Sequence, residues 1–138
     1  MITGDFITRL KTQCPSLKSR VFGSIELSSA TPTSMQMPCA FVVPMAEKAE
    51  GNMFIDGIAQ QITAQIGVVV CVKNVKDDKG EGGHIELDAI RNEIRSALCG
   101  FSTNEFGTVK FNSGQIAAYD GMHIRWNDIF TTQFFFSN

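Results

Sequence analysis

The sequence predicts an α+β fold, in which a long amphipathic helix and a short N-terminal helix pack on an antiparallel β-sheet. Its elements follow the order helix, strands, helix, strands. Apolar side chains recur every three and four residues in one long segment, and the last third of the chain is rich in aromatic residues and β-formers. The length of 138 residues is enough for a single domain, residues 1–138, to bury a core of its own.

The N-terminal segment predicts one short helix. Phe6 and Leu10 are four residues apart within residues 5–11, which places them on one face of a helix. Thr3 is the expected N-cap of this helix, and Pro15 follows the end of the pattern.

Three strands are predicted before the long helix. Residues 21–27 alternate between two faces, one of them apolar, as in a half-buried strand. Residues 39–43 form a continuous apolar run typical of a strand buried on both faces, and Pro44 either ends this strand or places it at a sheet edge. Residues 58–73 form the clearest long strand, and we expect its second half at the centre of the sheet.

The long helix is predicted over residues 85–98, with Gly100 as its C-cap. Its apolar residues recur at helical spacing: Leu87, Ile90, Ile94, Ala97 and Leu98. Four more strands are expected, over residues 108–111, 115–119, 122–126 and 129–136. Three glycines mark the expected turns between them: Gly107, Gly114 and Gly121.

Two polar connections complete the pattern. Residues 46–57 are either a hairpin connection or a short helical turn followed by a loop. They enclose the apolar triplet Met53, Phe54 and Ile55, which either folds back onto the core or forms an exposed anchor for a partner. Residues 74–83 are predicted to be a mobile charged loop.

Residues with catalytic or metal-binding potential are scattered along the chain. His84 and His123 are far apart and lack the spacing of metal ligands. The carboxylates and glycines of residues 77–83 match neither an EF-hand loop nor a P-loop. The four cysteines, none of them in a C-x-x-C pair, are typical of small core residues that stay reduced. We therefore expect no catalytic residue, no cofactor and no metal site.

Charge and hydropathy restrict the partners. A formal net charge of −2 and a pI of about 5.6 do not fit a general nucleic-acid-binding protein, in which Lys and Arg cluster. The first residues lack the basic and then apolar pattern of a signal peptide. The longest apolar run, residues 66–72, is too short to span a bilayer, so we expect no membrane partner.

Several segments occur in a recognisable order: Cys14-Pro15, Arg20-Val21-Phe22-Gly23, the run from Pro38 to Pro44, the strand end Val68 to Val72, an aspartate-glycine loop, the helix end Ala97-Leu98-Cys99-Gly100-Phe101, Gly114, and Trp126 to Thr132. This order and spacing, over most of the chain, resembles the phage tail terminator (tail-completion) family, which includes minor tail protein U. Phe101-Ser102 departs from the Trp-Pro expected after the helix.

The resemblance implies a structural virion protein and not an enzyme. Such proteins form a hexameric ring at the head-proximal end of the tail tube. The ring stops tube polymerisation and offers a surface to the head-completion protein. The implied partners are therefore further copies of the chain, the tail tube protein and the head-completion protein, with DNA passing through the lumen without specific binding. The implied location is the virion tail, after assembly in the host cytoplasm.

A charged segment followed by apolar residues suggests where the chain meets a neighbouring subunit or the tube, and a second charged loop is a further candidate. The residues predicted for this interface are Glu47, Lys48, Glu50, Met53, Phe54, Ile55, Asp77, Asp78 and Lys79.

Two other functions remain open on the sequence. The first is another ring-forming virion component, a head-completion or tail tube protein. The second is a small α+β enzyme or ligand-binding domain, for which polar groups must converge on a pocket. Only Tyr119, His123, Arg125 and Asp128 lie near one another in sequence.

Overall fold

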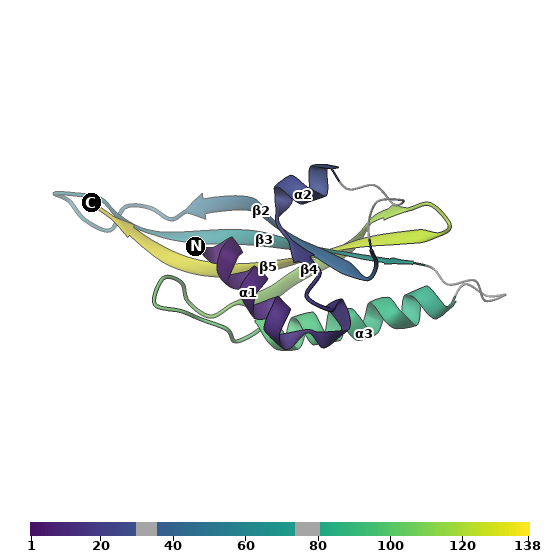
Figure 1. The fold of residues 1–138 in the computed structure, drawn as a ribbon. Helices are drawn as coiled ribbons and strands as arrows, with labels where there is room; N and C mark the ends of the chain where they lie inside the picture. The colour runs from purple at the N-terminus through teal and green to yellow at the C-terminus, as the bar shows by residue number, and fades with distance from the viewer. Residues whose placement is uncertain (30–35, 74–80) are drawn as a thin grey trace.

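A computed structural model of the protein describes residues 1–29, 36–73 and 81–138. A five-stranded sheet with the order β1-β2-β3-β5-β4 forms its centre (Figure 1). The strands are β1 (Val21–Phe22), β2 (Cys39–Ala49), β3 (Ala59–Lys73), β4 (Lys110–Tyr119) and β5 (His123–Ser137). The helices are α1 (Ile2–Gln13), α2 (Ser24–Ser29) and α3 (Glu81–Leu98), with a 3-10 turn over Pro15–Leu17. The predicted α+β class is confirmed.

The sheet is mixed and not antiparallel throughout. β2, β3, β5 and β4 pair antiparallel with their neighbours, whereas β1 pairs parallel with β2. The two strands run in the same direction because a crossover that contains α2 joins them, and a parallel pair requires such a connection. A hydrogen bond from the N–H of Ala40 to the carbonyl of Arg20 (3.0 Å) ties the short β1 to the sheet.

Even-numbered and odd-numbered residues of β3 face different helices. Even-numbered residues of β3 and β5 share one buried cluster with apolar residues of α1 and α3: Phe6, Leu10, Val68, Val70, Val72, Leu87, Ile90, Ile94, Leu98, Ile124 and Phe130. Odd-numbered residues of β3 join a smaller cluster on the other face, where Leu27 of α2 packs: Cys39, Phe41, Val69 and Cys71. Figure 1 shows α2 on the side of the sheet opposite α1 and α3. The second half of β3 is thus buried on both faces, as predicted.

A buried ion pair joins α3 to the sheet. Both oxygens of Asp128 on β5 accept hydrogen bonds from Arg91 of α3, each at 2.9 Å, and the Asp128 side chain is fully buried. The indole N–H of Trp126 donates to the same carboxylate (2.9 Å), and the Arg91 guanidinium lies 4.3 Å from the centre of the Trp126 ring. Arginine suits this place because its planar fork can hold a carboxylate with two parallel hydrogen bonds.

The segment after β1 differs from the prediction of a strand over residues 21–27. Only Val21–Phe22 is a strand, and Ser24–Ser29 forms α2. The carboxylate of Glu26 accepts a hydrogen bond from the backbone N–H of Gly23 (3.1 Å). This is the return contact of a capping box, and it favours the start of a helix at this point.

β2 continues through Pro44 to Ala49, with a register shift between Pro44 and Ala46. Proline is tolerated here because β1 pairs with β2 only at Ala40 and Phe41, which leaves Pro44 at a sheet edge. The edge alternative is therefore right, and residues 46–57 are part of a hairpin and not a helical turn.

β4 and β5 each replace two expected strands. Gly121, with a φ of 87°, lies in the turn between them, as predicted. Gly114 does not mark a turn, because β4 runs through it. Gly100, also at a φ of 87°, follows the end of α3, as expected of a C-cap.

Both main helices begin earlier than predicted. α1 starts at Ile2, so Thr3 lies inside the helix and is not its N-cap. α3 starts at Glu81, so the end of the predicted loop is helical, while residues 74–80 lie outside the described residues. No helix in the described part of the chain has the length and apolar character needed to cross a membrane.

All four cysteines are free thiols. Cys14, Cys39 and Cys71 are buried, as predicted. Cys99 is exposed, so its assignment to the core was wrong. It follows Leu98, the last residue of α3.

Candidate assembly surface

Three strands extend beyond the helices and form an arm, which consists of residues 46–63 and 133–138. Figure 1 shows the connection between β2 and β3 lying beside the C-terminal end of β5, beyond the N-terminal end of α1. The strand register accounts for this arrangement. Ala59 of β3 pairs with Ser137 of β5, and Ala49 of β2 pairs with Ile62 of β3. The arm is therefore a continuation of the central sheet.

The side chain of Asn52 braces the tip of the arm, residues 50–58. Its amide N–H₂ donates to the carbonyls of Phe54 and Gly57, each at 2.8 Å, and its Oδ1 accepts from the N–H of Ala59 at 2.8 Å. The N–H of Met53 donates to the carbonyl of Ala59 (2.9 Å). One asparagine thus supplies the polar partners that hold a short loop in a defined shape.

The tip presents the apolar triplet to solvent. Met53 is 60% exposed, Phe54 62% and Ile55 100%. Of the two alternatives for this triplet, folding back onto the core is wrong, and the side chains are exposed. A contiguous exposed apolar group on a braced loop is unusual on the surface of a monomer and is typical of a contact surface.

Glu47 and Lys48 lie on β2 at the base of the tip, and Glu50 lies at its start. All three side chains are exposed. Lys48 is level with Thr63 of β3, and the backbone N–H of Glu50 donates to the carbonyl of Gln61 (2.8 Å). The structure thus brings six of the predicted interface residues together on the arm. The remaining three, Asp77, Asp78 and Lys79, lie outside the described residues.

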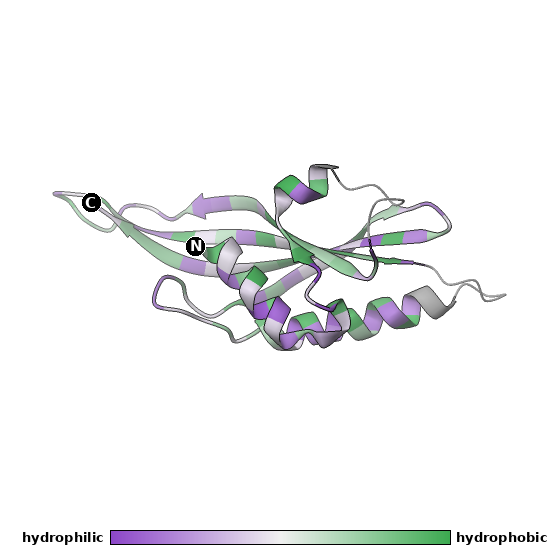
Figure 2. Ribbon diagram, viewed as in Figure 1, coloured by the Kyte–Doolittle hydropathy of each residue, from purple (hydrophilic) through white to green (hydrophobic). Residues whose placement is uncertain are grey.

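The arm carries two further exposed aromatic residues, Phe135 and Phe136, which the sequence reasoning did not single out. Phe134 packs against the core, whereas Phe136, on the same face, lies past the helices. The run of three phenylalanines was a usable signal, because consecutive residues of a strand point to opposite faces and cannot all enter one core. Figure 2 shows hydrophobic residues continuing along β5 toward the C-terminus.

The polar groups considered for an enzyme site do not converge. Asp128 faces α3 and is held by Arg91, whereas Arg125 is on the opposite face of β5 by the alternation of the strand. Tyr119 is exposed on β4, and His123 pairs with Asp120 in the neighbouring turn (3.1 Å). Among residues 1–29, 36–73 and 81–138, no group of three or more His, Cys, Asp or Glu side chains is placed to hold a metal ion.

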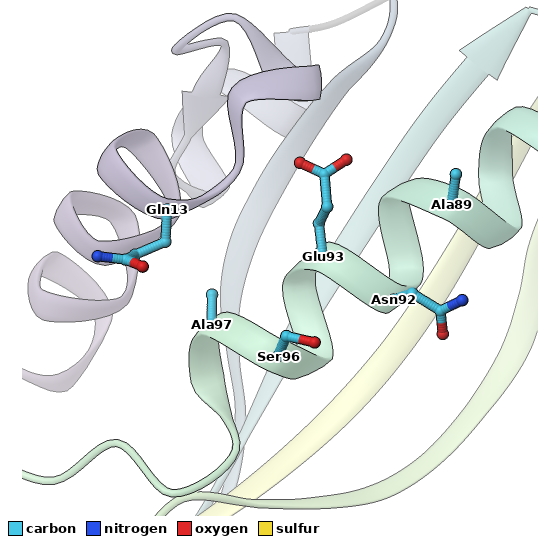
Figure 3. A pocket seen from close by; sticks show the side chains of 6 residues that line it. All are labelled: Gln13, Ala89, Asn92, Glu93, Ser96 and Ala97. Carbon is cyan, nitrogen blue, oxygen red and sulfur yellow. The ribbon is translucent and has the colours of Figure 1, made fainter.

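A shallow pocket lies between α1 and α3 (Figure 3). It is lined by Gln13, Ala89, Asn92, Glu93, Ser96 and Ala97. Glu93, its only charged lining residue, is already engaged, because its carboxylate accepts hydrogen bonds from the hydroxyl and the backbone N–H of Ser16. The pocket therefore offers small and neutral groups to a ligand and no reactive pair.

The braced arm exposes apolar side chains, which is typical of a surface that contacts a partner. The family model described as "Phage tail terminator protein" matches residues 3–138. The chain therefore belongs to the phage tail terminator family. It is a structural tail protein and a virion component, and membership in this family favours a non-enzymatic role.

A search of the curated proteins finds no significant match. Among the solved structures, a chain of the "Virion of native gene transfer agent (GTA) particle" aligns with a TM-score of 0.54 and 11% identity, over 96% of this chain and 92% of that one. At this identity the likeness shows a shared fold over nearly the whole of both chains.

Proposed function

We propose that this protein caps the head-proximal end of the phage tail tube as a hexameric ring. The ring stops further polymerisation of the tube and provides the surface to which the head-completion protein binds. Residues 1–138 act as a single tail-terminator-like domain. The proposal rests on membership in the tail terminator family.

The arm is the surface that we assign to the contact with the tube or with the neighbouring subunit. The observation that carries this assignment is the exposure of Met53, Phe54 and Ile55 on a loop that Asn52 holds in place. Burying such side chains against a partner removes apolar surface from water, at about 25 cal/mol per Å². Because the loop is braced before binding, little conformational entropy is lost on contact. Glu47, Lys48 and Glu50 form a polar rim beside the triplet.

A phage that lacks this protein tests the capping role. We expect tails of irregular or excessive length that fail to join filled heads, measured by electron microscopy of purified particles. Tails of normal length, firmly joined to filled heads, would overturn the proposal. If the purified protein instead polymerises into long tubes by itself, it is a tube protein and not a terminator.

The arm is tested in the same system with the double variant Phe54→Ser and Ile55→Ser. We expect loss of tail joining with an unchanged melting temperature, because both side chains are exposed in the folded chain. The control is Ile25→Ser, an apolar residue that is 82% exposed on α2, away from the arm. Normal tails in the double variant would contradict the role of the arm and leave the capping role in place.

A further inference from the structure

Two cysteines face each other across neighbouring strands of the sheet. Cys39, the first residue of β2, is level with Cys71 of β3. Both side chains belong to the cluster on the α2 side of the sheet, together with Phe41 and Val69. They are 1% and 0% exposed. The pair lies outside the arm, so a contact made by the arm does not account for it.

The strand geometry brings the two cysteines within bonding range. The N–H of Ala40 donates to the carbonyl of Arg20, so the backbone groups of Ala40 face β1. Those of Cys39 therefore face β3, because successive residues of a strand alternate in this respect. Cys39 and Cys71 are thus a hydrogen-bonded strand pair, whose Cα atoms are about 5.5 Å apart, and disulfides join Cα atoms about 4.4–6.8 Å apart. The two thiols also share a hydrogen bond.

Two arginines lie beside the pair. Arg125 of β5 is level with Cys71, and Nε–H of Arg20 donates to the carbonyl of Pro38, next to Cys39 (2.9 Å). The hydrogen bond from Cys71 lowers the pKa of Cys39 against the effect of burial, and the charges of Arg20 and Arg125 lower it further. The same hydrogen bond, together with burial, raises the pKa of Cys71. Cys39 is therefore the thiol that reacts as a thiolate, and Cys71 is the thiol that holds the proton.

Cys14 is equally buried but lacks both features. It is 0% exposed and packs in the cluster on the opposite face of the sheet, whose other described members are not cysteines. Burial and the negative charge of Glu93 raise the pKa of Cys14 to about 11. Burial alone therefore does not distinguish the Cys39–Cys71 pair. A second thiol directly opposite and a positive surrounding distinguish it.

We propose that Cys39 and Cys71 form a cross-strand disulfide when the protein meets a peroxide. The thiolate of Cys39 attacks one oxygen of hydrogen peroxide, the O–O bond breaks, and Cys39 becomes a sulfenic acid while the departing hydroxide takes up a proton. The sulfur of Cys71 then attacks the sulfur of Cys39. The S–O bond breaks, and the hydroxyl group leaves as water with the proton of the Cys71 thiol. Two thiols are oxidised to one disulfide, and one peroxide is reduced to two waters.

The bond joins β2 to β3 at the end of their hairpin that lies away from the arm. Cβ atoms of directly opposite residues are about 4.5–5.5 Å apart, against about 3.8 Å in most disulfides. The strands must draw together to form the bond, which makes it one that thiols reduce readily. The pair therefore stays reduced in a reducing compartment and closes in an oxidising one. This chemistry is independent of the proposed capping role.

Treatment of the full, reduced chain with hydrogen peroxide tests the proposal. After catalase has removed the peroxide, the chain is unfolded and labelled with iodoacetamide, and mass spectrometry of its peptides locates labels and cross-links. We expect Cys39 and Cys71 to lose their labels and to appear in one disulfide-linked pair of peptides. Dithiothreitol, added before unfolding, should restore both labels. Cys14 is the internal control and should keep its label throughout.

The exposed Cys99 sets the peroxide dose. If Cys39 and Cys71 keep their labels at a dose that oxidises Cys99, the proposal is wrong. Loss of both labels without a linked pair of peptides, or a link that involves Cys14 in place of either residue, would overturn it as well.

Two serine variants test the order of the steps. Cys71→Ser should stop at the sulfenic acid of Cys39, which dimedone captures when it is present during unfolding, because the serine hydroxyl still donates a hydrogen bond but cannot form the disulfide. Cys39→Ser should slow the oxidation of Cys71 by about tenfold or more, because the more acidic thiol is gone. Equal rates of oxidation of Cys71 with and without Cys39 would contradict the role of Cys39 as the attacking thiol. If either variant fails to fold, the peptides of the unmodified chain still decide whether the bond forms.

Discussion

At Gly114 the strand β4 passes over the ion pair that joins α3 to the sheet. A Cβ at this position would clash with Oδ1 of Asp128, and it would lie 2.9 Å from Nε1 of Trp126 and 3.0 Å from Nη2 of Arg91. All three atoms belong to one hydrogen-bonded group, so none can give way without disturbing the others. The glycine is required by this close approach and not by a turn.

Gly114→Ala should therefore lower the free energy of unfolding by about 2 kcal/mol or more, because overpacking here also disturbs a buried charge pair. Equilibrium denaturation in urea measures the change. Gly51→Ala is the matched control: its Cβ would meet nothing within 4 Å, and the expected change is within about 0.5 kcal/mol. Equal stability of the two variants would show that the cluster relaxes around a methyl group.

The cysteines differ in accessibility and in acidity. Cys99 is exposed, whereas Cys14, Cys39 and Cys71 are buried. Burial, with a smaller contribution from the charge of Glu93, raises the pKa of Cys14 to about 11. A hydrogen bond with Cys39, together with burial, raises the pKa of Cys71. Because the thiolate is the reactive form, a raised pKa lowers reactivity at every pH below it.

We expect iodoacetamide at pH 8 to add one label to the native protein, on Cys99, and to label the buried thiols only after unfolding. Intact-mass spectrometry counts the labels, and Cys99→Ser should remove the native one. A second label on the folded chain would contradict the burial of the other three thiols.

The raised pKa of Cys14 also sets a direction for stability at alkaline pH. The protonated Cys14 thiol makes its full contribution to the free energy of unfolding below the ordinary pKa of 9.0. This contribution is lost as pH rises through the pKa of about 11 that Cys14 has in the folded chain. The free energy of unfolding should therefore fall across this window. Cys14→Ala should remove this part of the pH dependence.

Among the elements, long periodic segments were predictable from sequence and short or interrupted ones were not. α3 and β3 each repeat one period over many residues. The apolar residues predicted for the face of α3 all lie in the core, and the second half of β3 is buried on both faces, as expected. α2 was missed because six residues hold too little of a helical period to outweigh the apparent alternation. Its real signal was Glu26, placed to accept from the backbone N–H of Gly23.

Interruptions within strands were harder to interpret: Gly114 was mistaken for a turn, and Pro44 left two alternatives open. Pro44 and Gly114 both lie inside strands, because one is at an uncovered edge and the other faces a crowded cluster. Neither condition is visible before the strands are paired. The same applies to the candidate surface: the apolar triplet was visible in the sequence, but its exposure was not. The place of Phe135 and Phe136 on the arm follows from the β3–β5 register, which pairs them with Gln61 and Gln60.

At the tip of the arm, Asn52 gives a graded prediction. Asn52→Ala removes its hydrogen bonds, whereas Asn52→Asp keeps an acceptor for the N–H of Ala59 and loses the donors to Phe54 and Gly57. Proteolysis within residues 50–58 should therefore be slowest in the unmodified chain, faster in the Asp variant and fastest in the Ala variant. The global free energy of unfolding should change by about 1 kcal/mol or less, since the tip contributes no apolar side chain to the core. An alanine variant as resistant as the unmodified chain would show that the strands alone hold the tip.

For the whole molecule, the balance of charge bears on how DNA would pass through the proposed ring. Lys and Arg number 12 against 14 Asp and Glu. Several of the cations are engaged within the chain: Arg91 is paired with Asp128, and Arg9 and Arg20 donate to the carbonyls of Ala97 and Pro38. Affinity for duplex DNA comes mainly from phosphate contacts and counterion release, which this surface is poorly equipped to supply.

The protein should therefore show no duplex binding at physiological salt in an electrophoretic or fluorescence-anisotropy assay. The double variant Glu47→Lys with Glu50→Lys reverses the sign of the net charge. It also gives three cations within residues 47–50, with Lys48 as one of the three. It should bind duplex DNA at low salt, with an affinity that falls steeply as salt rises, because each phosphate contact releases a condensed counterion. That variant shows that the assay detects a basic patch when one is present. If the unmodified chain binds as tightly as the variant, DNA is held and not merely passed, and the neutral-to-acidic lumen implied by free passage is wrong.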